Sequence, residues 1–267
     1  MKKLDQLSHS VFGENKENSI LFLHGFMGSK EDWQFLVNEL QKSFCCILID
    51  LPGHGKNIPD NIQDYSLDNC ADNIVSLLND LNIGKSGLVG YSMGGRTGLF
   101  TLLKYPEYFK KIVLESVNPG IEDEIELANR AENDRKTADR IVNDDFNTFL
   151  NDWYSQPLFG NISENENYPR LIENRSENDR EGLSNSLHYM GTGMQPPLWS
   201  RIPEIKSEIL YIAGELDNKY VHIGSRLKSI KHDLKLEIIE KAGHNTHFQQ
   251  PGIFVEKVTK YFTQQEV

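Results

Sequence analysis

The segment Gly90-Tyr91-Ser92-Met93-Gly94 constrains the fold of this chain more than any other feature. It has the pattern Gly-x-Ser-x-Gly, follows an apolar run over residues 87–90 and precedes a helical pattern over residues 93–104. Between a strand and a helix, the glycines permit a tight, strained turn that lifts the serine above the sheet. The glycine spacings of phosphate-binding and dinucleotide-binding loops are absent. The sequence therefore predicts an exposed, reactive serine at residue 92.

Apolar runs and helical patterns alternate along the first part of the chain. Strand-like runs occur at residues 19–24, 44–49, 87–90 and 111–117. Helical patterns occur at residues 31–43, 67–81 and 93–104. This alternation predicts a mostly parallel central sheet with helices on both faces, which is the α/β class. Two later strands at residues 208–214 and 235–239, with a last helix over 251–262, complete the expected core.

The pattern changes at Asn118-Pro119-Gly120. From there to residue 199 the chain is rich in polar residues, has no buried-strand run and is interrupted by Pro157, Pro169, Pro196 and Pro197. This composition predicts an inserted helical cap. We expect residues 1–117 and 200–267 to form one core and residues 118–199 to form the cap.

The formal net charge of −11 disfavours nucleic acid and anionic membranes as partners, because both are bound by basic surfaces. No apolar run approaches the ~20 residues of a membrane span. Residues 1–10 lack the apolar segment of a secretory signal, so we expect a cytoplasmic protein. The sequence gives no indication of its oligomeric state.

The three cysteines, Cys45, Cys46 and Cys70, are expected to be reduced core residues. Cys45 and Cys46 are neighbours in a predicted strand, so their side chains should lie on opposite faces. No His-Glu-x-x-His or Cys-x-x-Cys spacing occurs, and we expect neither a metal nor a cofactor.

A serine is a weak nucleophile or base unless a histidine activates it. With this turn, the catalytic acid and then the histidine follow the serine along the chain, on loops at the same edge of the sheet. Asp217 and His244 each follow a predicted strand and are the best candidates. Glu215 is the alternative acid. His247 is the alternative base, although we expect it to be solvated or to cap a helix.

Backbone N–H groups are expected to stabilise a developing oxyanion at this site. In this arrangement one comes from the residue after the serine, Met93, and one from the loop after the first parallel strand, Phe26. The side chains of Phe26 and Met27 either line the pocket or pack in the core. His24 and His54 are expected to hold their glycine-containing loops by hydrogen bonds.

Arginine is concentrated in the predicted cap, and its planar guanidinium is well suited to carboxylates. The cap arginines are Arg130, Arg135, Arg140, Arg170, Arg175 and Arg180. An alternative is that several form helix ion pairs, because acidic residues lie four positions from Arg130, Arg135 and Arg140. Arg96 differs from them because it lies one helical turn after Ser92.

Longer motifs extend the elbow and run through the cap and the later loops. They are Gly94-Gly95-Arg96, Ala128-Asn129-Arg130, Asn133-Asp134-Arg135, Ala138-Asp139-Arg140, Asp152-Trp153-Tyr154-Ser155-Gln156-Pro157, Gly214-Glu215-Leu216-Asp217 and Ala242-Gly243-His244-Asn245. In this combination the chain resembles the 2-succinyl-6-hydroxy-2,4-cyclohexadiene-1-carboxylate synthases of menaquinone biosynthesis, which have the α/β-hydrolase fold. The resemblance extends from Leu21 to the C-terminal helix.

The resemblance implies a lyase that eliminates pyruvate from 2-succinyl-5-enolpyruvyl-6-hydroxy-3-cyclohexene-1-carboxylate. It implies that Ser92, activated by His244 and Asp217, is a general base on a ring carbon, with Phe26 and Met93 as oxyanion donors. It also implies that the small substrate with several carboxylates is bound by Tyr91, Arg96, Arg135, Trp153 and Arg175. Fold alone does not decide the reaction. Hydrolysis of an ester or carbon–carbon bond by the same triad, or ligand binding without catalysis, remain alternatives.

Overall fold

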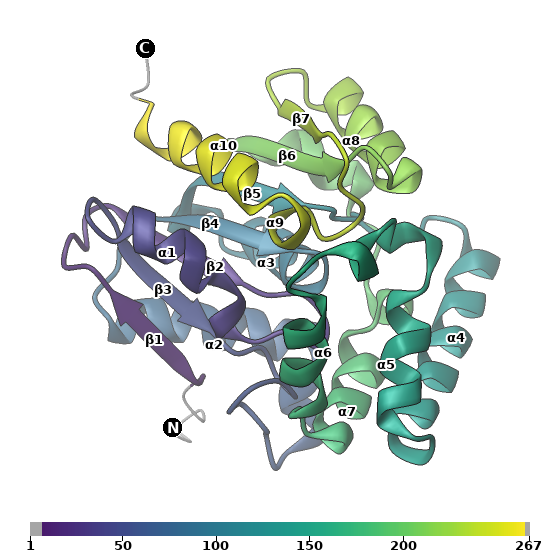
Figure 1. Cartoon of the computed structure of the whole chain (residues 1–267). Helices are drawn as coiled ribbons and strands as arrows, with labels where there is room; N and C mark the ends of the chain where they lie inside the picture. The colour runs from purple at the N-terminus through teal and green to yellow at the C-terminus, as the bar shows by residue number, and fades with distance from the viewer. Residues whose placement is uncertain (1–6, 265–267) are drawn as a thin grey trace.

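A seven-stranded sheet forms the centre of the computed structural model, which describes residues 7–264 (Figure 1). Its strand order is β1-β3-β2-β4-β5-β6-β7. The strands are β1 (His9–Phe12), β2 (Ser19–Leu23), β3 (Cys45–Ile49), β4 (Ser86–Tyr91), β5 (Phe109–Glu115), β6 (Glu208–Gly214) and β7 (Lys235–Ile239). Only β1 pairs antiparallel with its neighbour. The predicted mostly parallel α/β sheet is confirmed.

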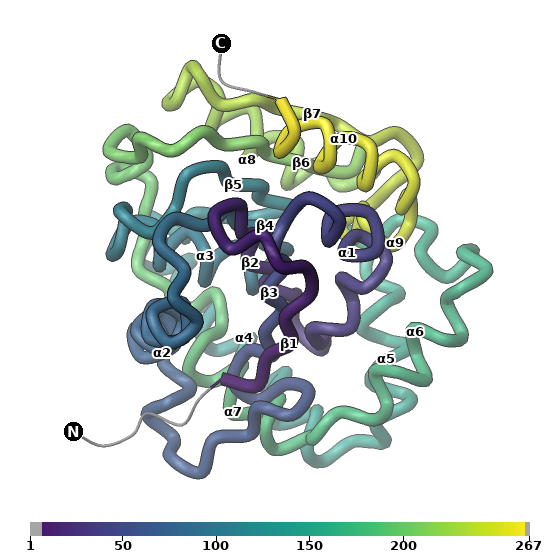
Figure 2. The backbone as a smooth tube through the Cα atoms, turned by 90° about the vertical axis from the view of Figure 1, so that its left-hand side faces the viewer, coloured from purple at the N-terminus to yellow at the C-terminus, as the bar shows by residue number. Residues whose placement is uncertain are grey.

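The sequence analysis did not predict β1. This strand has four residues, lies at the end of the strand order and is visible at the near edge of the sheet in Figure 2. A short, partly exposed edge strand carries too few apolar positions to give a clear pattern. The expectation that residues 1–10 are not a secretory signal falls partly on residues 1–6, which lie outside the described residues.

Helices cover both faces of the sheet. The core helices are α1 (Gln34–Leu40), α2 (Leu67–Asp80), α3 (Met93–Lys104), α8 (Asn218–Ile230), α9 (Thr246–Gln249) and α10 (Pro251–Thr263). Residues of α2, α3 and α8 pack in one apolar cluster, and residues of α1 and α10 pack in another on the opposite face. Cys45 and Cys46 belong to different clusters, and both are buried and free, as is Cys70. The predicted role of the cysteines is confirmed.

Four longer helices occupy the chain between β5 and β6. They are α4 (Glu124–Asn143), α5 (Phe146–Tyr154), α6 (Tyr168–Ser176) and α7 (Arg180–Met190). They share an apolar cluster that includes Ile141, Phe149 and Leu183, and Figure 1 shows them together at one end of the sheet. Domain boundaries at residues 117/118 and 199/200 stay a prediction. None of the helices in the described part of the chain is long and apolar enough to cross a membrane.

The short 3-10 helices of the structure lie mostly in connections. They are η1 (Lys30–Trp33), η2 (Ile62–Tyr65), η3 (Pro106–Tyr108), η4 (Pro157–Phe159), η5 (Ile162–Glu164), η6 (Thr192–Met194) and η7 (Trp199–Glu204). The predicted helix over residues 31–43 is divided between η1 and α1. Its apolar stripe of Trp33, Leu36, Val37 and Leu40 is nevertheless buried as expected.

The parallel register brings the ends of neighbouring strands to one edge of the sheet. Leu23 of β2 pairs with Gly90 of β4, and Tyr91 pairs with Glu115 of β5. The loops that follow these strands, and those that follow β6 and β7, therefore lie beside the cap. This edge is where ligands bind in α/β sheets of this kind.

Gly94 allows α3 to approach the end of β2. A Cβ at residue 94 would lie 2.3 Å from the carbonyl oxygen of Leu23, a backbone atom that cannot rotate away. We expect Gly94→Ala to lower the free energy of unfolding by about 1–3 kcal/mol because of this overpacking. Gly252→Ala is the matched control, since residue 252 has open space around it and lies in α10. It should stabilise the protein by about 0.5–1 kcal/mol in urea denaturation. Equal effects of the two substitutions would contradict the prediction.

Candidate active site

Ser92 occupies a strained turn between β4 and α3. Its φ of 48° and ψ of −108° are uncommon for a residue with a side chain. A Cβ on Gly90 would lie 2.6 Å from the Cα of Gly95. The two sides of the turn can therefore pack this closely only because residue 90 is a glycine. The Ser92 N–H donates to the carbonyl of Glu115 at 2.9 Å. The elbow predicted from the sequence therefore has the expected local structure.

The structure brings Ser92, His244 and Asp217 together. His244 Nε2 lies 2.9 Å from Ser92 Oγ, and His244 Nδ1 lies 2.8 Å from Asp217 Oδ2. Asp217 and His244 are buried. An Nδ1–H that donates to the carboxylate leaves Nε2 as the acceptor for the serine proton. This is the geometry of an activated serine.

The two alternative residues do not enter this chain of hydrogen bonds. Glu215 accepts a hydrogen bond from the Lys241 N–H at the protein surface. His247 is buried, and its Nδ1 lies 2.7 Å from Glu115 Oε2. The expectation that His247 is solvated was wrong, because a buried carboxylate and the neighbouring rings of Trp33 and Tyr91 enclose it.

Two residues that line the cavity beside Ser92 have a backbone N–H without an acceptor in the described part of the chain. Neither Phe26 N–H nor Met93 N–H has an acceptor among residues 7–264, and both residues line the same cavity as Ser92. The Met27 N–H, in contrast, donates a hydrogen bond to His54 Nε2 at 3.1 Å. Met93 is also the first residue of α3, where the helix dipole favours negative charge. The role of these two groups as oxyanion donors stays a prediction, and Met27 packs in the cap core.

His24 and His54 hold the loops beside the elbow, as predicted. His24 Nε2 accepts from the Leu51 N–H at 3.0 Å, and its Nδ1 lies 2.8 Å from the Gly25 carbonyl. His54 Nδ1 likewise lies 3.1 Å from the Pro52 carbonyl. Burial lowers the pKa of His24 and, with the nearby His24, lowers the pKa of His54 to about 3. Both rings are therefore neutral at physiological pH.

A cavity of about 150 Å³ opens beside Ser92, between the sheet edge and the cap. Arg96 lines it from α3, with its guanidinium donating to Gln195 Oε1 and the Met190 carbonyl, each at 3.1 Å. Burial and the positive charge of Arg130 lower the pKa of Arg96 to about 10. Two guanidinium groups that repel each other in a cavity favour the binding of an anion between them.

The cap contributes Arg130, rather than Arg135, to the cavity. Arg130 lines it and donates to Asp134 Oδ1 at 2.7 Å. Arg135 has a side chain that is 59% exposed and is paired with Glu132. Five residues along a helix turn the side chain by about 140°, so the two arginines cannot face the same side. The structure places Arg135 outside the cavity, which disfavours its expected contact with substrate; its ion pair is formed with Glu132, three residues before it, and not with the acidic residue four positions away.

The other cap arginines have different surroundings. Arg140 forms exposed ion pairs with Asp144 and Asp152, and Arg180 donates to backbone carbonyls at the end of α4. Arg170 lines a second, larger hollow outside the cavity.

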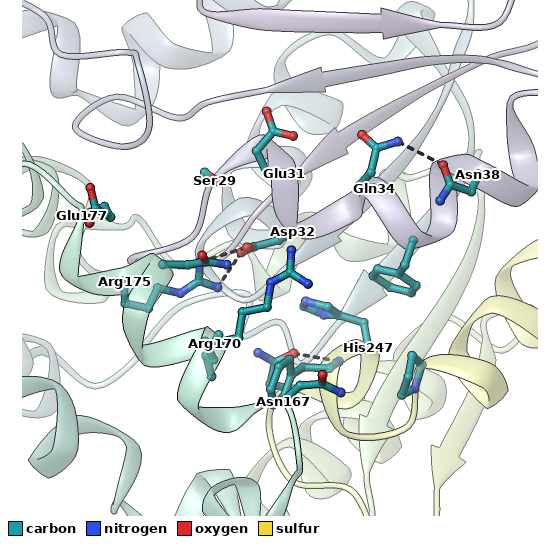
Figure 3. A pocket seen from close by; sticks show the side chains of 16 residues that line it. Ser29, Glu31, Asp32, Gln34, Asn38, Asn167, Arg170, Arg175, Glu177 and His247 are labelled. Carbon is teal, nitrogen blue, oxygen red and sulfur yellow. Dashed lines mark hydrogen bonds and ion pairs between the residues drawn. The ribbon is translucent and has the colours of Figure 1, made fainter.

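Arg175 and Asp32 line both the cavity and this outer hollow, which has a volume of about 790 Å³. Figure 3 shows the pair at the outer hollow. The guanidinium binds the Asp32 carboxylate through two hydrogen bonds of 2.9 and 2.7 Å, and Nε lies 3.3 Å from the Tyr154 hydroxyl. Burial alone would raise the pKa of Asp32, but the charge of Arg175 holds it below its ordinary value. Asp32 thus fixes a permanently charged Arg175 at the cavity.

Aromatic side chains complete the cavity. Tyr91 and Trp153, for which the resemblance implies contact with substrate, both line it, and Trp153 contacts Phe26 at 5.5 Å between ring centroids. Burial and the charge of Glu115 raise the pKa of Tyr91, so its hydroxyl is a hydrogen-bond donor rather than a base.

Lys219 and Tyr220 also line the cavity and were not predicted from the sequence. Both lie in the first turn of α8, two and three residues after Asp217, and this proximity was an available signal. No group of three His, Cys, Asp or Glu side chains suited to a metal ion occurs among the described residues.

Comparisons with known proteins agree with this geometry. Residues 18–251 match the family model described as alpha/beta hydrolase fold. A Bacillus subtilis (strain 168) protein that is provisionally named a 2-succinyl-6-hydroxy-2,4-cyclohexadiene-1-carboxylate synthase is 38% identical over 255 residues, covering 94% of this chain and 92% of the relative. An Enterobacter sp. (strain 638) protein with the same name, not provisional, is 32% identical over 87% of each chain.

This chain belongs to the 2-succinyl-6-hydroxy-2,4-cyclohexadiene-1-carboxylate synthase family.

A solved structure described as MenH from S. aureus is similar to this member of the synthase family along nearly its whole length. The TM-score is 0.89, with 27% identity, and the match covers 95% of this chain and 97% of the other. The resemblance inferred from the cap motifs is confirmed, as is the α/β-hydrolase fold. Members of the synthase family are lyases that act on a small molecule, although their scaffold is that of hydrolases.

The neutral, buried imidazole of His54 makes the stability of this synthase-family chain depend on pH. Its folded pKa of about 3 lies below the unfolded value of about 6.5, so the unfolded chain binds more protons between these values. This stabilisation is complete above pH 6.5 and is lost as the pH falls. At pH 5.5 the loss from His54 should be about 1.4 kcal/mol of unfolding free energy.

Urea denaturation at several values between pH 5 and pH 7.5 measures this slope. His54→Gln should reduce it, whereas His222→Gln at the exposed surface should not. Asp32 and Asp50 also have lowered pKa values. The stabilisation that they contribute is lost only as the pH falls below their unfolded pKa values of about 4, which lies outside this range. The same slope in His54→Gln and wild type would contradict the prediction.

Proposed function

We propose that this chain eliminates pyruvate from 2-succinyl-5-enolpyruvyl-6-hydroxy-3-cyclohexene-1-carboxylate to give 2-succinyl-6-hydroxy-2,4-cyclohexadiene-1-carboxylate. The observation that carries the proposal is an assembled Ser92-His244-Asp217 triad that opens into a cavity lined by arginines. An acidic chain that gathers cations at its reactive serine is suited to a substrate with several negative charges.

The names of the substrate and product define the electron flow. A proton leaves ring carbon 2, which is next to the succinyl ketone, and its electron pair forms the bond between carbons 2 and 3. The double bond between carbons 3 and 4 moves to carbons 4 and 5, and the bond from carbon 5 to the enolpyruvyl oxygen breaks. The leaving enolpyruvate takes up a proton and becomes pyruvate.

Ser92 is the proposed base in this reaction. Its Oγ takes the ring proton as its own proton moves to His244 Nε2, so no covalent bond to the substrate is required. Asp217 holds the His244 ring in the required tautomer and stabilises the imidazolium.

The two free N–H groups suit the charge that develops in this step. When the proton leaves, negative charge moves onto the oxygen of the succinyl ketone. The N–H groups of Phe26 and Met93 are free to donate to that oxygen, and donors already in place need no reorganisation during the reaction.

The cations of the cavity match the carboxylates of the substrate. The substrate has a ring carboxylate, a succinyl carboxylate and an enolpyruvyl carboxylate. Arg96, Arg130 and Arg175 line the cavity, and Lys219 adds a fourth positive charge. Tyr91 and Trp153 present aromatic surface to the ring.

We also propose that this protein is cytoplasmic and binds neither nucleic acid nor anionic membranes. A net charge of −11 supports the absence of nucleic-acid and anionic-membrane partners. Three buried, unpaired cysteines support a reducing compartment, and we propose the cytoplasm.

The acid of the triad can be tested against its rival. We expect Asp217→Asn to lower kcat for pyruvate release at least about a hundredfold, because the amide neither fixes the tautomer nor stabilises the imidazolium. Ser92→Ala should lose at least as much. Glu215→Gln is the matched control and should retain wild-type activity. Pyruvate is measured with a coupled dehydrogenase; full activity in Ser92→Ala, or none in wild type, would contradict the proposed function.

The cap arginines provide a second test. Arg130→Ala should lower kcat/KM for pyruvate release about 10- to 100-fold, because it removes a charged hydrogen-bond donor from the cavity. Arg135→Ala removes an equal charge from the same helix, but it should retain the activity of wild type. The opposite order of effects would show that the cap binds substrate through another face of α4.

A further inference from the structure

Glu115 is a fully buried carboxylate that the proposed reaction does not use. It is the last residue of β5, the strand beside the one that leads to Ser92. Its backbone carbonyl accepts the hydrogen bond from the Ser92 N–H. The side chain does not line the cavity beside Ser92, so it has no direct contact with a bound substrate.

The Glu115 carboxylate binds the segment that carries the catalytic histidine. Oε1 accepts from the Thr246 hydroxyl at 2.6 Å and from the His247 N–H at 2.9 Å. Oε2 lies 2.7 Å from His247 Nδ1. A buried carboxylate is costly without partners, and here both oxygens have them.

The next residue adds a fourth hydrogen bond to the same segment. Ser116 Oγ donates to the carbonyl of His244 at 2.9 Å. Its backbone has a φ of 51°, which is uncommon for a residue with a side chain and is maintained only when the surroundings compensate for it. The Ser116 N–H also donates to the Ile212 carbonyl of β6.

We propose that Glu115 is a positioning residue, which with Ser116 ties the 244–247 segment to the elbow and so sets the distance between His244 and Ser92. The end of β5 contacts both sides of the triad: Ser92 through the backbone, and the histidine segment through side chains. Elsewhere that segment is tied to the cap, where the His244 N–H donates to the Leu158 carbonyl. The Glu115 contacts join it to the sheet independently of the cap.

Aromatic side chains pack around His247 and restrict its movement against Glu115. Its ring lies 4.7 Å from Trp33, 4.9 Å from Tyr91 and 5.8 Å from Phe254, measured between centroids. Tyr91 in turn lies 5.5 Å from the ring of His244. A shift of the carboxylate is therefore passed to His244 through both the backbone and a packed aromatic ring. A misplacement of about 1 Å at such a site can cost about a hundredfold in rate.

The first test removes one hydrogen bond with little change of shape. Thr246→Val should lower kcat for pyruvate release about tenfold with KM unchanged, because Thr246 lies outside the cavity. Thr246→Ser keeps the hydroxyl and should restore most of kcat. A loss of kcat in both variants, a change confined to KM, or full activity in Thr246→Val would overturn the proposal.

The second test uses Glu115 itself and does not need the lyase reaction. The rate at which a fluorophosphonate modifies Ser92, followed by intact mass, depends on activation of Ser92 by His244. Glu115→Ala should lower this rate about 10- to 100-fold. Glu115→Gln keeps an oxygen acceptor and should lose less. Lys231→Met removes a buried charge at the far end of α8 and serves as the control for loss of stability; it should label like wild type.

The outcomes separate this inference from the proposed function, on which its kinetic part rests. Slower labelling in Glu115→Ala, together with no pyruvate release by wild type, would support the positioning role and reject the proposed function. Unchanged labelling in Glu115→Ala, or an equal decrease in Lys231→Met, would reject the positioning role whatever the reaction is. If Glu115→Ala does not fold, the Thr246 pair decides the question.

Discussion

The site depends on a backbone contact that only glycine permits. Because Gly90 and Gly94 carry no Cβ, α3 begins directly against the ends of β2 and β4. This contact forces Ser92 into its strained conformation and aims the N-terminus of α3 at the cavity. The parallel register then supplies the other parts, since every loop that follows a parallel strand reaches the same edge. The loops at this edge thus carry the reactive serine, its histidine and acid, and the proposed oxyanion donors.

The cap contributes positive charge to the cavity rather than residues of the triad. Arg130 and Arg175 come from its helices, whereas Arg96 comes from the core, so cations from both parts meet at the cavity. In a cavity of low dielectric such charges interact far more strongly than in water. The same hydrolase scaffold can therefore support a different reaction when its inserted segment places cations at the serine. Because the triad belongs to the core and most of the cavity arginines belong to the cap, the elbow motif indicated the fold and the cap motifs indicated the family.

The sequence predicted those features that depend on local pattern. Apolar runs located six of the seven strands, and the elbow located Ser92 with its partners in chain order. The edge strand β1 was missed because four partly exposed residues give no clear period. Arg135 was chosen over Arg130 because a motif does not reveal which side of α4 faces the cavity. The environment of His247 depends on Glu115, which is 132 residues distant in sequence, and no local pattern reports such a contact.

The ion pair of Asp32 and Arg175 anchors one helix of the cap to the core. It joins α6 to the core at a buried position, and leaving either charge there without its partner costs about 3–5 kcal/mol. Arg130 on α4 is held only by its own helix and has a side chain that is 36% exposed. The cavity of about 150 Å³ is smaller than the 300–1,000 Å³ that is common for ligand sites. The Asp32–Arg175 pair therefore joins the α6 side of a small cavity to the core, and the charge that it holds there does not depend on the rest of the cap.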